Sequence, residues 1–294
     1  MTVIDLHAHS TRSDGKESPT EVFTQAAQSG VNVLALTDHD TTEGWSEAAE
    51  ASKQFGLGFI PGIELTTRAT VPHGQTSQLI SVHLLAYLPD PKHPKLQTMM
   101  GESVASRQVR AMAMVDLLAV DFEISWDDVL AELSHGATIG RPAIADALIT
   151  RGFVASRSEA FAGILSKSGG YYVPNQVVDT VDAIQTVLDA GGVPIIAHPL
   201  TGIGSNADRG DLPLAHFEAL IASGLAGFEV YHREVPELAR DWLLELAAEH
   251  DLIVTGSSDY HGIHGKPNRL GENTTSEEML SRILSSASGT PAQL

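Results

Sequence analysis

The histidine pair near the start of the chain is the first feature whose residue types and spacing could do chemistry. His7 and His9 lie two positions apart in the segment IDLHAHSTRSDG, residues 4–15, directly after a short apolar run. Imidazole nitrogens at this spacing can bind one metal ion. A single pair in a chain with 13 histidines is a weak signal by itself. Its interpretation depends on whether other potential ligands converge on the same place.

Seven further residues of metal-ligand type lie within an apolar run, at its end or in the loop that follows it. They are Asp14, His39, Glu64, His83, His198, Asp259 and His261. Because the chain has no cysteine, a metal must be held by imidazole nitrogens and carboxylate oxygens, a donor set that suits zinc, manganese or iron. Nine candidates exceed what one ion needs. They predict two or three divalent metal ions (Mn, Fe or Zn), with carboxylates bridging.

The charge of such a centre indicates what it would bind. Three divalent ions and the three candidate carboxylates leave a local excess of roughly +3, which favours a phosphate group. Arg141 is the candidate for a clamp on substrate phosphate, because a guanidinium binds phosphate bidentately; an ion pair at a helix start is the alternative. Arg107 and Arg110 are weaker candidates. We expect Asp259 and His198 to take part in catalysis as well as in metal binding.

Strands and helices alternate in the first hundred residues, and this alternation would position the candidates. Strands are expected at residues 2–6, 31–36, 57–63 and 79–88, helices at 19–29 and 42–55, and surface loops at 71–78 and 88–95. Ser18, Pro19 and Glu21 form a helix start signal, and Gly30 a stop signal. Alternation of this kind predicts a parallel sheet with helices outside.

The pattern changes between residues 98 and 175, where helix follows helix. Helices are expected at 104–120, 125–136, 142–151 and 156–165. Three more strands follow, in VPIIAHP, GFEVYH and LIVTGSSDYH, with helices at 181–190, 216–222, 236–250 and 276–286. We therefore predict a seven-stranded barrel from residues 1–97 and 176–294, with 98–175 as a helical insertion that covers the site. In a closed parallel barrel the strand ends face one mouth, where the candidates would meet.

Composition limits the partners of the chain. The 294 residues suffice for one barrel-sized domain or two smaller ones. No apolar run could span a membrane and the first residues lack a secretory signal, so we expect a cytoplasmic protein without membrane contact. The net charge of −19 argues against binding DNA or long RNA. A small phosphorylated substrate, such as a nucleotide, is compatible with it. The sequence leaves the oligomeric state open.

Six motifs, taken in order, resemble one known family. The motifs are DLHAHSTRSDG, TDHD, PGIE, HLLAY, AHP and SDYH. They are similar to the motifs of the PHP (polymerase and histidinol phosphatase) superfamily, and most similar to those of its subgroup with a helical insertion bearing GRP. The resemblance covers most of the chain. It implies a distorted (β/α)7 TIM-like barrel, a trinuclear metal centre and phosphoesterase activity. One departure is Ala143, where the subgroup leads us to expect a histidine after GRP.

The resemblance also implies a distribution of ligands over three metals. The first metal would take His7, His9, Glu64 and Asp259; the second Glu64, His83 and His198; the third Asp14, His39 and His261, with Glu64 as a bridge. We therefore expect a metal-dependent phosphoesterase that hydrolyses phosphomonoesters of small nucleotides, such as AMP or 3′,5′-bisphosphonucleotides. A hydroxide bridging the metals would attack phosphorus. Ala143 puts the inherited substrate preference in question.

Several alternatives stay open from the sequence. The function could be that of a histidinol phosphatase, a 5′→3′ exoribonuclease, a non-catalytic metal- or nucleotide-binding module, or an amidohydrolase, which also uses an H-x-H pair after its first strand. His83 could be a packing residue instead of a ligand. Asp38 and Asp40 are better candidates for positioning groups than for ligands, and His232 is undecided. The segment GGYYVP is read as a loop with packed tyrosines that could form a wall of the pocket.

Overall fold

Seven strands form a nearly closed barrel. The structure is a computed structural model that describes residues 2–73, 76–133, 139–201 and 213–294. The strands are β1 (Ile4–Asp5), β2 (Val33–Leu36), β3 (Gly58–His73), β4 (Thr76–Tyr87), β5 (Val193–Ile196), β6 (Gly227–Tyr231) and β7 (Ile253–Gly256). They are hydrogen-bonded in chain order, and a parallel bridge between Ala8 and Tyr260 joins the two ends. The expected α/β barrel fold is confirmed.

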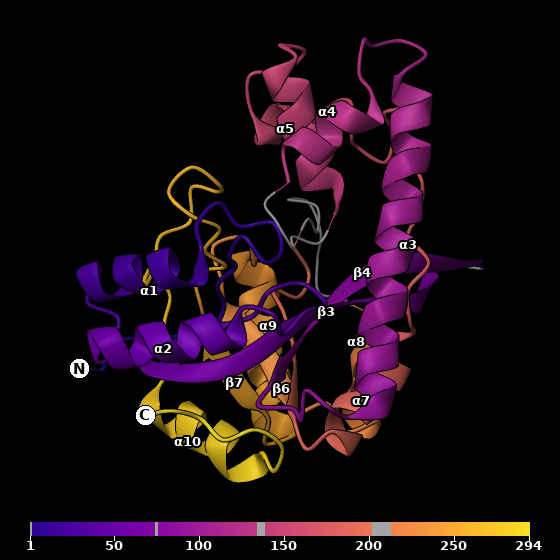
Figure 1. Ribbon diagram of the computed structural model, residues 1–294. Helices are drawn as coiled ribbons and strands as arrows, with labels where there is room; N and C mark the ends of the chain where they lie inside the picture. The colour runs from indigo at the N-terminus through magenta and orange to yellow at the C-terminus, as the bar shows by residue number, and fades with distance from the viewer. Residues whose placement is uncertain (1, 74–75, 134–138, 202–212) are drawn as a thin grey trace.

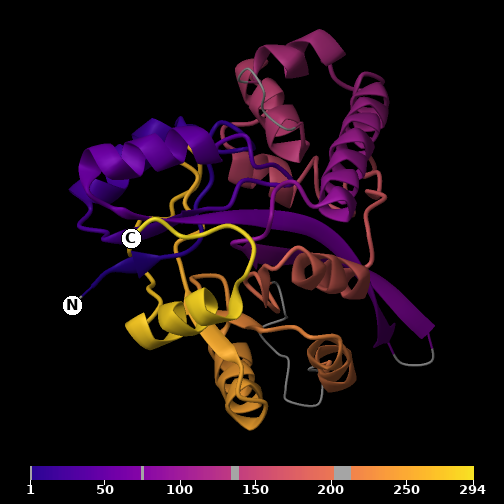
Figure 2. The same cartoon turned by 60° about the horizontal axis from the view of Figure 1, so that its bottom comes forward.

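Strand β4 departs from the predicted parallel sheet. It pairs antiparallel with both β3 and β5, whereas the other neighbouring pairs are parallel. The expected loop at 71–78 is also wrong, because β3 continues to His73 and β4 begins at Thr76, forming a long hairpin that leaves the barrel (Figure 2). The strand continues through Pro72 because the edge of a two-stranded ribbon tolerates a proline.

Helices α1, α2, α7, α8, α9 and α10 surround the barrel (Figure 1). Their bounds are α1 (Pro19–Gln28), α2 (Trp45–Phe55), α7 (Thr180–Asp189), α8 (Leu214–Ala222), α9 (Glu237–Glu249) and α10 (Glu277–Ser286). The predicted start of α1 is confirmed, since Ser18 and Glu21 form a capping box and Pro19 is the first helical residue. None of the helices within the described ranges is long and apolar enough to cross a membrane.

The barrel interior is apolar at the end away from the candidate residues. Leu6, Tyr87 and Ile195 are fully buried there, and Leu280 and Ile283 of α10 pack against the same cluster. The Tyr87 hydroxyl donates to the carbonyl of Leu6 at 2.9 Å, which satisfies its one polar group. This filled core gives the strands a rigid base, so that the residues following them are held in fixed positions at the opposite end.

Four helices form a second body above the barrel mouth (Figure 1). They are α3 (Pro94–Leu118), α4 (Trp126–Ala131), α5 (Arg141–Thr150) and α6 (Arg157–Ala162). Helix α3 belongs to both bodies: Leu96 packs in a barrel cluster, while Met114 and Leu118 pack with α4–α6 in a separate cluster. We call α4–α6 with the second half of α3 the helical lobe.

The start of α3 differs from the prediction. The helix begins at Pro94, not at residue 104, because proline suits the first helical position and the apolar face continues through Leu96 and Met99. It therefore runs without a break through residue 98. The proposed division of the chain at residues 98 and 175 stays a prediction. The expected helix at 125–136 ends at Ala131, and its last positions, 134–136, lie outside the described residues.

Candidate metal centre

The structure brings the nine sequence-predicted ligand candidates together at the barrel mouth. Three overlapping groups have ligand atoms within 4.8 Å of one another: His9, Asp14, His39 and His261; His7, His9, Glu64 and Asp259; and His39, Glu64 and His83. His198 belongs to none of these groups, but its Nε2 lies 3.1 Å from Glu64 Oε1. The third group differs from the set that the family resemblance implies for the second metal, because it contains His39 where that set has His198. Metal binding itself stays a prediction.

Glu64 is the centre of the cluster. Its carboxylate is 1% exposed and faces five imidazole rings. The distances are 3.2 Å from Oε2 to His7 Nε2, 3.0 Å to His9 Nε2 and 3.3 Å to His39 Nδ1, and 2.8 Å from Oε1 to His83 Nδ1 and 3.1 Å to His198 Nε2. One carboxylate with both oxygens shared in this way has the geometry of a bridging ligand.

The direction of β4 explains how His83 reaches the cluster. If β4 were parallel to its neighbours, a residue at the mouth would have to follow the strand. His83 instead lies inside β4. Because β4 is antiparallel to β3, His83 faces Thr66, and Leu85 faces Glu64. Side chains two residues apart lie on the same face of a sheet, so His83 and Glu64 are diagonal neighbours. The packing alternative for His83 has less support, since its side chain is 29% exposed and lines a cavity.

The imidazole nitrogens of the cluster are better placed to bind a cation than to form hydrogen bonds with one another. His7 Nε2 and His9 Nε2 lie 3.0 Å apart, and the buried atoms His39 Nδ1 and His261 Nε2 have no hydrogen-bond partner among the described residues. Burial lowers the pKa of His39 and of His261, so these rings are neutral and present lone pairs. Buried polar atoms are normally satisfied. Imidazole nitrogens with free lone pairs beside carboxylate oxygens therefore match the nitrogen and oxygen ligands of a divalent cation.

The carboxylates of the cluster are held in their charged form. Burial alone would raise the pKa of Asp259, but the charges of Lys266 and of the histidines outweigh it and keep the pKa well below its usual range. For His9, burial favours the neutral ring, yet hydrogen bonds to Asp259 and Glu64 raise the pKa to about 9. Since a metal ligand must be deprotonated, cation binding here would release protons.

Glu229 supports the cluster from behind and was not among the sequence-predicted candidates. His7 Nδ1 donates to its Oε1 at 3.0 Å, and the backbone N–H of His198 donates to Oε2 at 2.8 Å. Burial opposes ionisation, but the charge of His7 holds the pKa of Glu229 at about 2. A carboxylate on the far nitrogen fixes the ring of a metal-binding histidine. The signal in the sequence was an acidic residue inside the apolar strand GFEVY.

The loop that carries Asp14 is shaped by a buried aspartate and a glycine. Asp38 accepts hydrogen bonds from Ser10 N at 2.8 Å and from Ser13 Oγ at 2.6 Å. A Cβ atom on Gly15 would lie 2.6 Å from the carbonyl oxygen of His9, so only glycine allows the loop to close there. Asp38 belongs to none of the three ligand groups, in line with its interpretation as a positioning residue.

Two residues beside Asp259 complete the mouth. Lys266 Nζ lies 2.7 Å from Asp259 Oδ2, and this lysine, absent from our candidates, follows the last strand in the loop HGIHGKP. The buried ring of His232 has its Nε2 3.7 Å from the same oxygen. Asp259 and His198 have left-handed backbones, with φ of 53° and 29°. Such conformations are uncommon for residues other than glycine and concentrate at functional sites.

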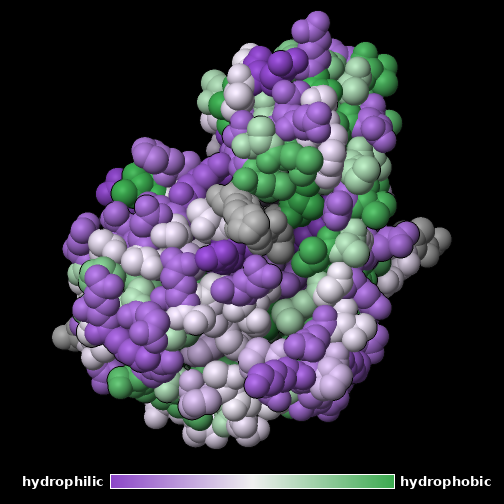
Figure 3. Space-filling model, viewed as in Figure 1, coloured by the Kyte–Doolittle hydropathy of each residue, from purple (hydrophilic) through white to green (hydrophobic). Residues whose placement is uncertain are grey.

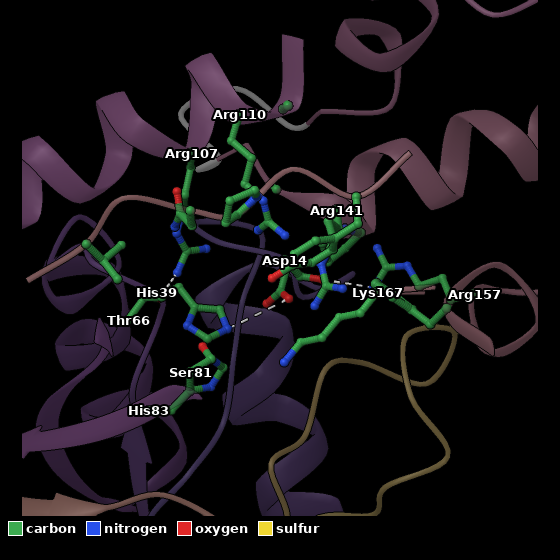
Figure 4. A pocket seen from close by; sticks show the side chains of 18 of the residues that line it. Asp14, His39, Thr66, Ser81, His83, Arg107, Arg110, Arg141, Arg157 and Lys167 are labelled. Atoms are coloured by element: carbon green, nitrogen blue, oxygen red, sulfur yellow. Dashed lines mark hydrogen bonds and ion pairs between the residues drawn. The ribbon is translucent and has the colours of Figure 1, made fainter. Parts of the chain in front are cut away.

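A cavity of about 700 Å³ separates the mouth from the helical lobe, where Figure 3 shows a recess. Asp14, His39 and His83 line its barrel side, and Arg110, Arg141 and Lys167 are among the residues on the lobe side (Figure 4). Its volume lies in the range of small-molecule sites. A ligand in this cavity would contact the predicted metal ligands and the basic residues of the lobe at once.

The arginines of the lobe are packed against aromatic rings. The guanidinium of Arg141 lies 5.1 Å from the ring of Phe161 and 5.8 Å from that of Tyr172, and it donates to the carbonyl of Leu165 at 3.4 Å. Arg110 lies 5.1 Å from the Tyr172 ring and donates to the carbonyl of Val173. Burial and the charge of Arg141 lower the pKa of Arg110 to about 10. No carboxylate of the described residues pairs with Arg141, contrary to the ion-pair alternative.

Arg107 and Ala143 have different surroundings. Arg107 pairs with Asp40 at 2.7 Å and also donates to the hydroxyl of Thr66, so its charge is compensated. Ala143 lines a smaller cavity of about 60 Å³ next to Asp14. A larger side chain at this position would reduce that space. The departure from the subgroup pattern thus lies beside the loop of Asp14, at the edge of the main cavity.

A family model for the PHP domain matches residues 5–156, more than half of the chain. The chain belongs to the PHP domain family. It is 42% identical to a chain from Bifidobacterium adolescentis that is provisionally assigned as a metal-dependent phosphoesterase, with a TM-score of 0.88 over 98% of this chain and 97% of that one. The family predicted from the six motifs is therefore confirmed.

Three curated relatives of this PHP protein cover nearly the whole chain. The phosphoribosyl 1,2-cyclic phosphate 1,2-diphosphodiesterase of Eggerthella lenta is 31% identical over 91% of this chain and 97% of its own length. The 5′-3′ exoribonuclease of Haemophilus influenzae is 34% identical, with 87% and 89% covered. The 3′,5′-nucleoside bisphosphate phosphatase of Chromobacterium violaceum is 32% identical, with 89% and 88% covered. All three names describe hydrolases of phosphoric esters.

Proposed function

We propose that this protein is a metal-dependent phosphoesterase that hydrolyses phosphomonoesters of small nucleotides, of the AMP or 3′,5′-bisphosphonucleotide type. The observation that carries the proposal is the composition of the two walls of one cavity. Asp14, His39 and His83 form one wall, and the other wall includes Arg110 and Arg141, which have no carboxylate partner among the described residues. The relatives' names support the same class of reaction, because each acts on a phosphoric ester.

The nine clustered residues would hold two or three divalent ions. When bound, the ions would lower the pKa of the attacking water and stabilise the charge that develops on the phosphoryl oxygens. Glu64 contacts the largest number of candidate rings and would bridge two ions. Glu229 fixes the ring of His7 through Nδ1, which leaves Nε2 directed at the cluster.

The lobe would bind the parts of the substrate that do not react. Arg141 and Arg110 line the cavity, and their partners among the described residues are carbonyl groups and aromatic rings, so a phosphate can approach their N–H groups. Tyr172 lines the same cavity and offers a ring on which a base could stack. We propose that these residues hold a second phosphate or the base while the reacting phosphate lies at the mouth. Such an arrangement suits a bisphosphonucleotide better than histidinol phosphate.

A panel of hydrolysis assays tests the proposal. The protein, reconstituted with Mn²⁺, Fe²⁺ or Zn²⁺, is supplied with AMP, 3′,5′-bisphosphoadenosine, histidinol phosphate and a 5′-phosphorylated oligonucleotide, and released phosphate or nucleotide is measured. We expect the highest kcat/KM with one of the two small nucleotides. The highest value with the oligonucleotide would favour the exoribonuclease alternative. No hydrolysis of any ester by metal-loaded protein would contradict the proposed activity and favour a binding module.

A further inference from the structure

Asp14 differs from the other metal-ligand candidates in how it is held. Glu64 and His83 lie within strands and the other six follow a strand end within five residues, whereas Asp14 lies nine residues after β1, farther along the loop that leads to α1. Its carboxylate is 17% exposed, and Oδ1 lies 3.2 Å from His261 Nε2. Its position therefore depends on what holds the loop, because no strand fixes its backbone.

Asp38 and Gly15 shape this loop from the barrel side, and the helical lobe adds a contact to Asp14 itself. Arg157, the first residue of α6, donates from Nη1 to the backbone carbonyl of Asp14 at 3.2 Å (Figure 4). Among the described residues, the backbone of Asp14 forms no other hydrogen bond. The contact joins residues 143 positions apart in the sequence, so it forms only when the lobe and the barrel are together.

A buried carboxylate fixes Arg157 in this position. The Nε and Nη2 atoms of Arg157 donate to Oδ1 and Oδ2 of Asp146, each at 2.7 Å, in a bidentate pair. Lys16, two residues beyond Asp14, donates to the same carboxylate at 2.5 Å. The side chains of Arg157 and Asp146 are only 14% and 10% exposed. A planar guanidinium in a bidentate pair has little freedom to move, so the lobe can hold the loop at two points.

We propose that Arg157 is a positioning residue that couples docking of the lobe to one part of the metal centre, the group of His9, Asp14, His39 and His261. The inference rests on the proposed metal centre. The lobe then has a second role besides covering the cavity, since it sets the place of one ligand. Loss of the Arg157 contact loosens the backbone at Asp14 and weakens one metal position, while the two groups that do not contain Asp14 keep their ligands.

Binding of Mn²⁺ to the full chain tests this coupling. Equilibrium dialysis with elemental analysis gives the number of equivalents and their affinities for the wild type, Arg157→Ala and Asp14→Asn. We expect Arg157→Ala to weaken one equivalent by about 10- to 100-fold, the usual effect of removing a residue that supports a ligand. Asp14→Asn should affect the same equivalent. Arg157→Lys keeps the charge beside Asp146 and should restore part of the affinity.

Controls separate this inference from the proposed function. Arg151→Ala removes another lobe arginine, which donates to the carbonyl of Glu123, and should leave all equivalents unchanged. Asp146→Asn loosens Arg157 without removing it and should weaken the same equivalent. This variant keeps the test available if Arg157→Ala does not fold. Wild-type affinity in both Arg157→Ala and Asp146→Asn, or equal weakening of all equivalents, would overturn the coupling. A wild type that binds no metal would overturn the proposed centre and the coupling with it.

Discussion

The barrel mouth and the helical lobe face the same cavity with opposite chemistry. At the mouth, Glu64 and Asp259 are surrounded by imidazole rings and are held in their charged form by the groups around them. In the lobe, Arg110 and Arg141 contact aromatic rings and carbonyl oxygens. The mouth thus offers carboxylate oxygens and imidazole nitrogens to a cation, whereas Arg110 and Arg141 of the lobe offer N–H groups to an anion. This difference indicates which region would bind metal and which would bind substrate charge, and each region can be tested separately.

The largest effect is expected at the mouth. Asp259→Asn and His39→Ala should each reduce kcat by at least about a hundredfold at saturating metal, because each removes a ligand from charge stabilised chiefly in the transition state. Circular dichroism should show an intact fold. Asp116→Asn, an exposed aspartate on α3, is the matched control and should keep full activity. Near wild-type turnover in either mouth variant would remove that residue from the ligand set.

In the lobe, the expected effect is on substrate binding. Arg141→Ala should raise KM for a nucleotide by about 10- to 100-fold, for a lost charged contact of about 1.5–3 kcal/mol. KM for a small aryl phosphate, which cannot reach the lobe, should change much less. Arg151→Ala serves as the control. Equal losses with both substrates would mean that Arg141 contacts the reacting phosphate, and no loss with either would exclude it from substrate binding.

A smaller effect is expected behind the mouth. Glu229→Gln keeps the shape of the side chain but removes the charge that His7 contacts. The affinity for Mn²⁺, measured by calorimetric titration, should fall by about tenfold, as for other residues that orient a ligand. Glu102→Gln, on the exposed face of α3, should change nothing. Unchanged metal affinity in Glu229→Gln would mean that Glu229 has only a packing role.

The smallest expected effect concerns pH and the contact between lobe and barrel. Burial alone would raise the pKa of Asp146, but Arg157 and Lys16 hold it below the ordinary value of 3.8. A carboxyl with a lowered pKa stabilises the fold above its unfolded pKa, and this contribution is lost as pH falls through the folded value. Asp146→Asn should therefore lower the free energy of unfolding by about 1–3 kcal/mol at pH 6.

Chemical denaturation at two pH values measures this contribution. The difference between wild type and Asp146→Asn should shrink when the pH falls well below 3.8, because the wild-type carboxyl then becomes neutral as well. A difference that stays constant from pH 6 to pH 3 would show that the charge of Asp146 does not contribute to the stability of the fold.

The mouth could be predicted from the sequence because its residues follow the strands. Each apolar run ends near a histidine or carboxylate, and a barrel brings such ends together. The direction of β4 could not be predicted, since the period-two alternation of a strand reads the same in either direction. His83 therefore entered the candidate set although it lies inside its strand. The hairpin beyond it was missed because residues 71–78 were expected to form a surface loop.

Residues that act across long sequence distances were harder to find. Glu229 and Lys266 have no spacing motif that links them to the ligands they contact, although both lie near strand ends. Arg157 was absent from our candidates, because its contact with Asp14 depends on how two separately packed bodies meet. Local patterns report periodicity and helix caps, whereas such contacts arise from the packing of distant elements.

Phosphate release during a metal titration tests whether hydrolysis depends on ions held at the barrel mouth. Metal-free protein is supplied with 3′,5′-bisphosphoadenosine, and the initial rate is recorded as Mn²⁺ is added in known equivalents. We expect no release without metal, a rise that reaches its plateau at two or three equivalents, and the same number of equivalents retained by the protein on elemental analysis. A rate that is independent of added metal, or protein that retains less than one equivalent at saturation, would contradict this expectation.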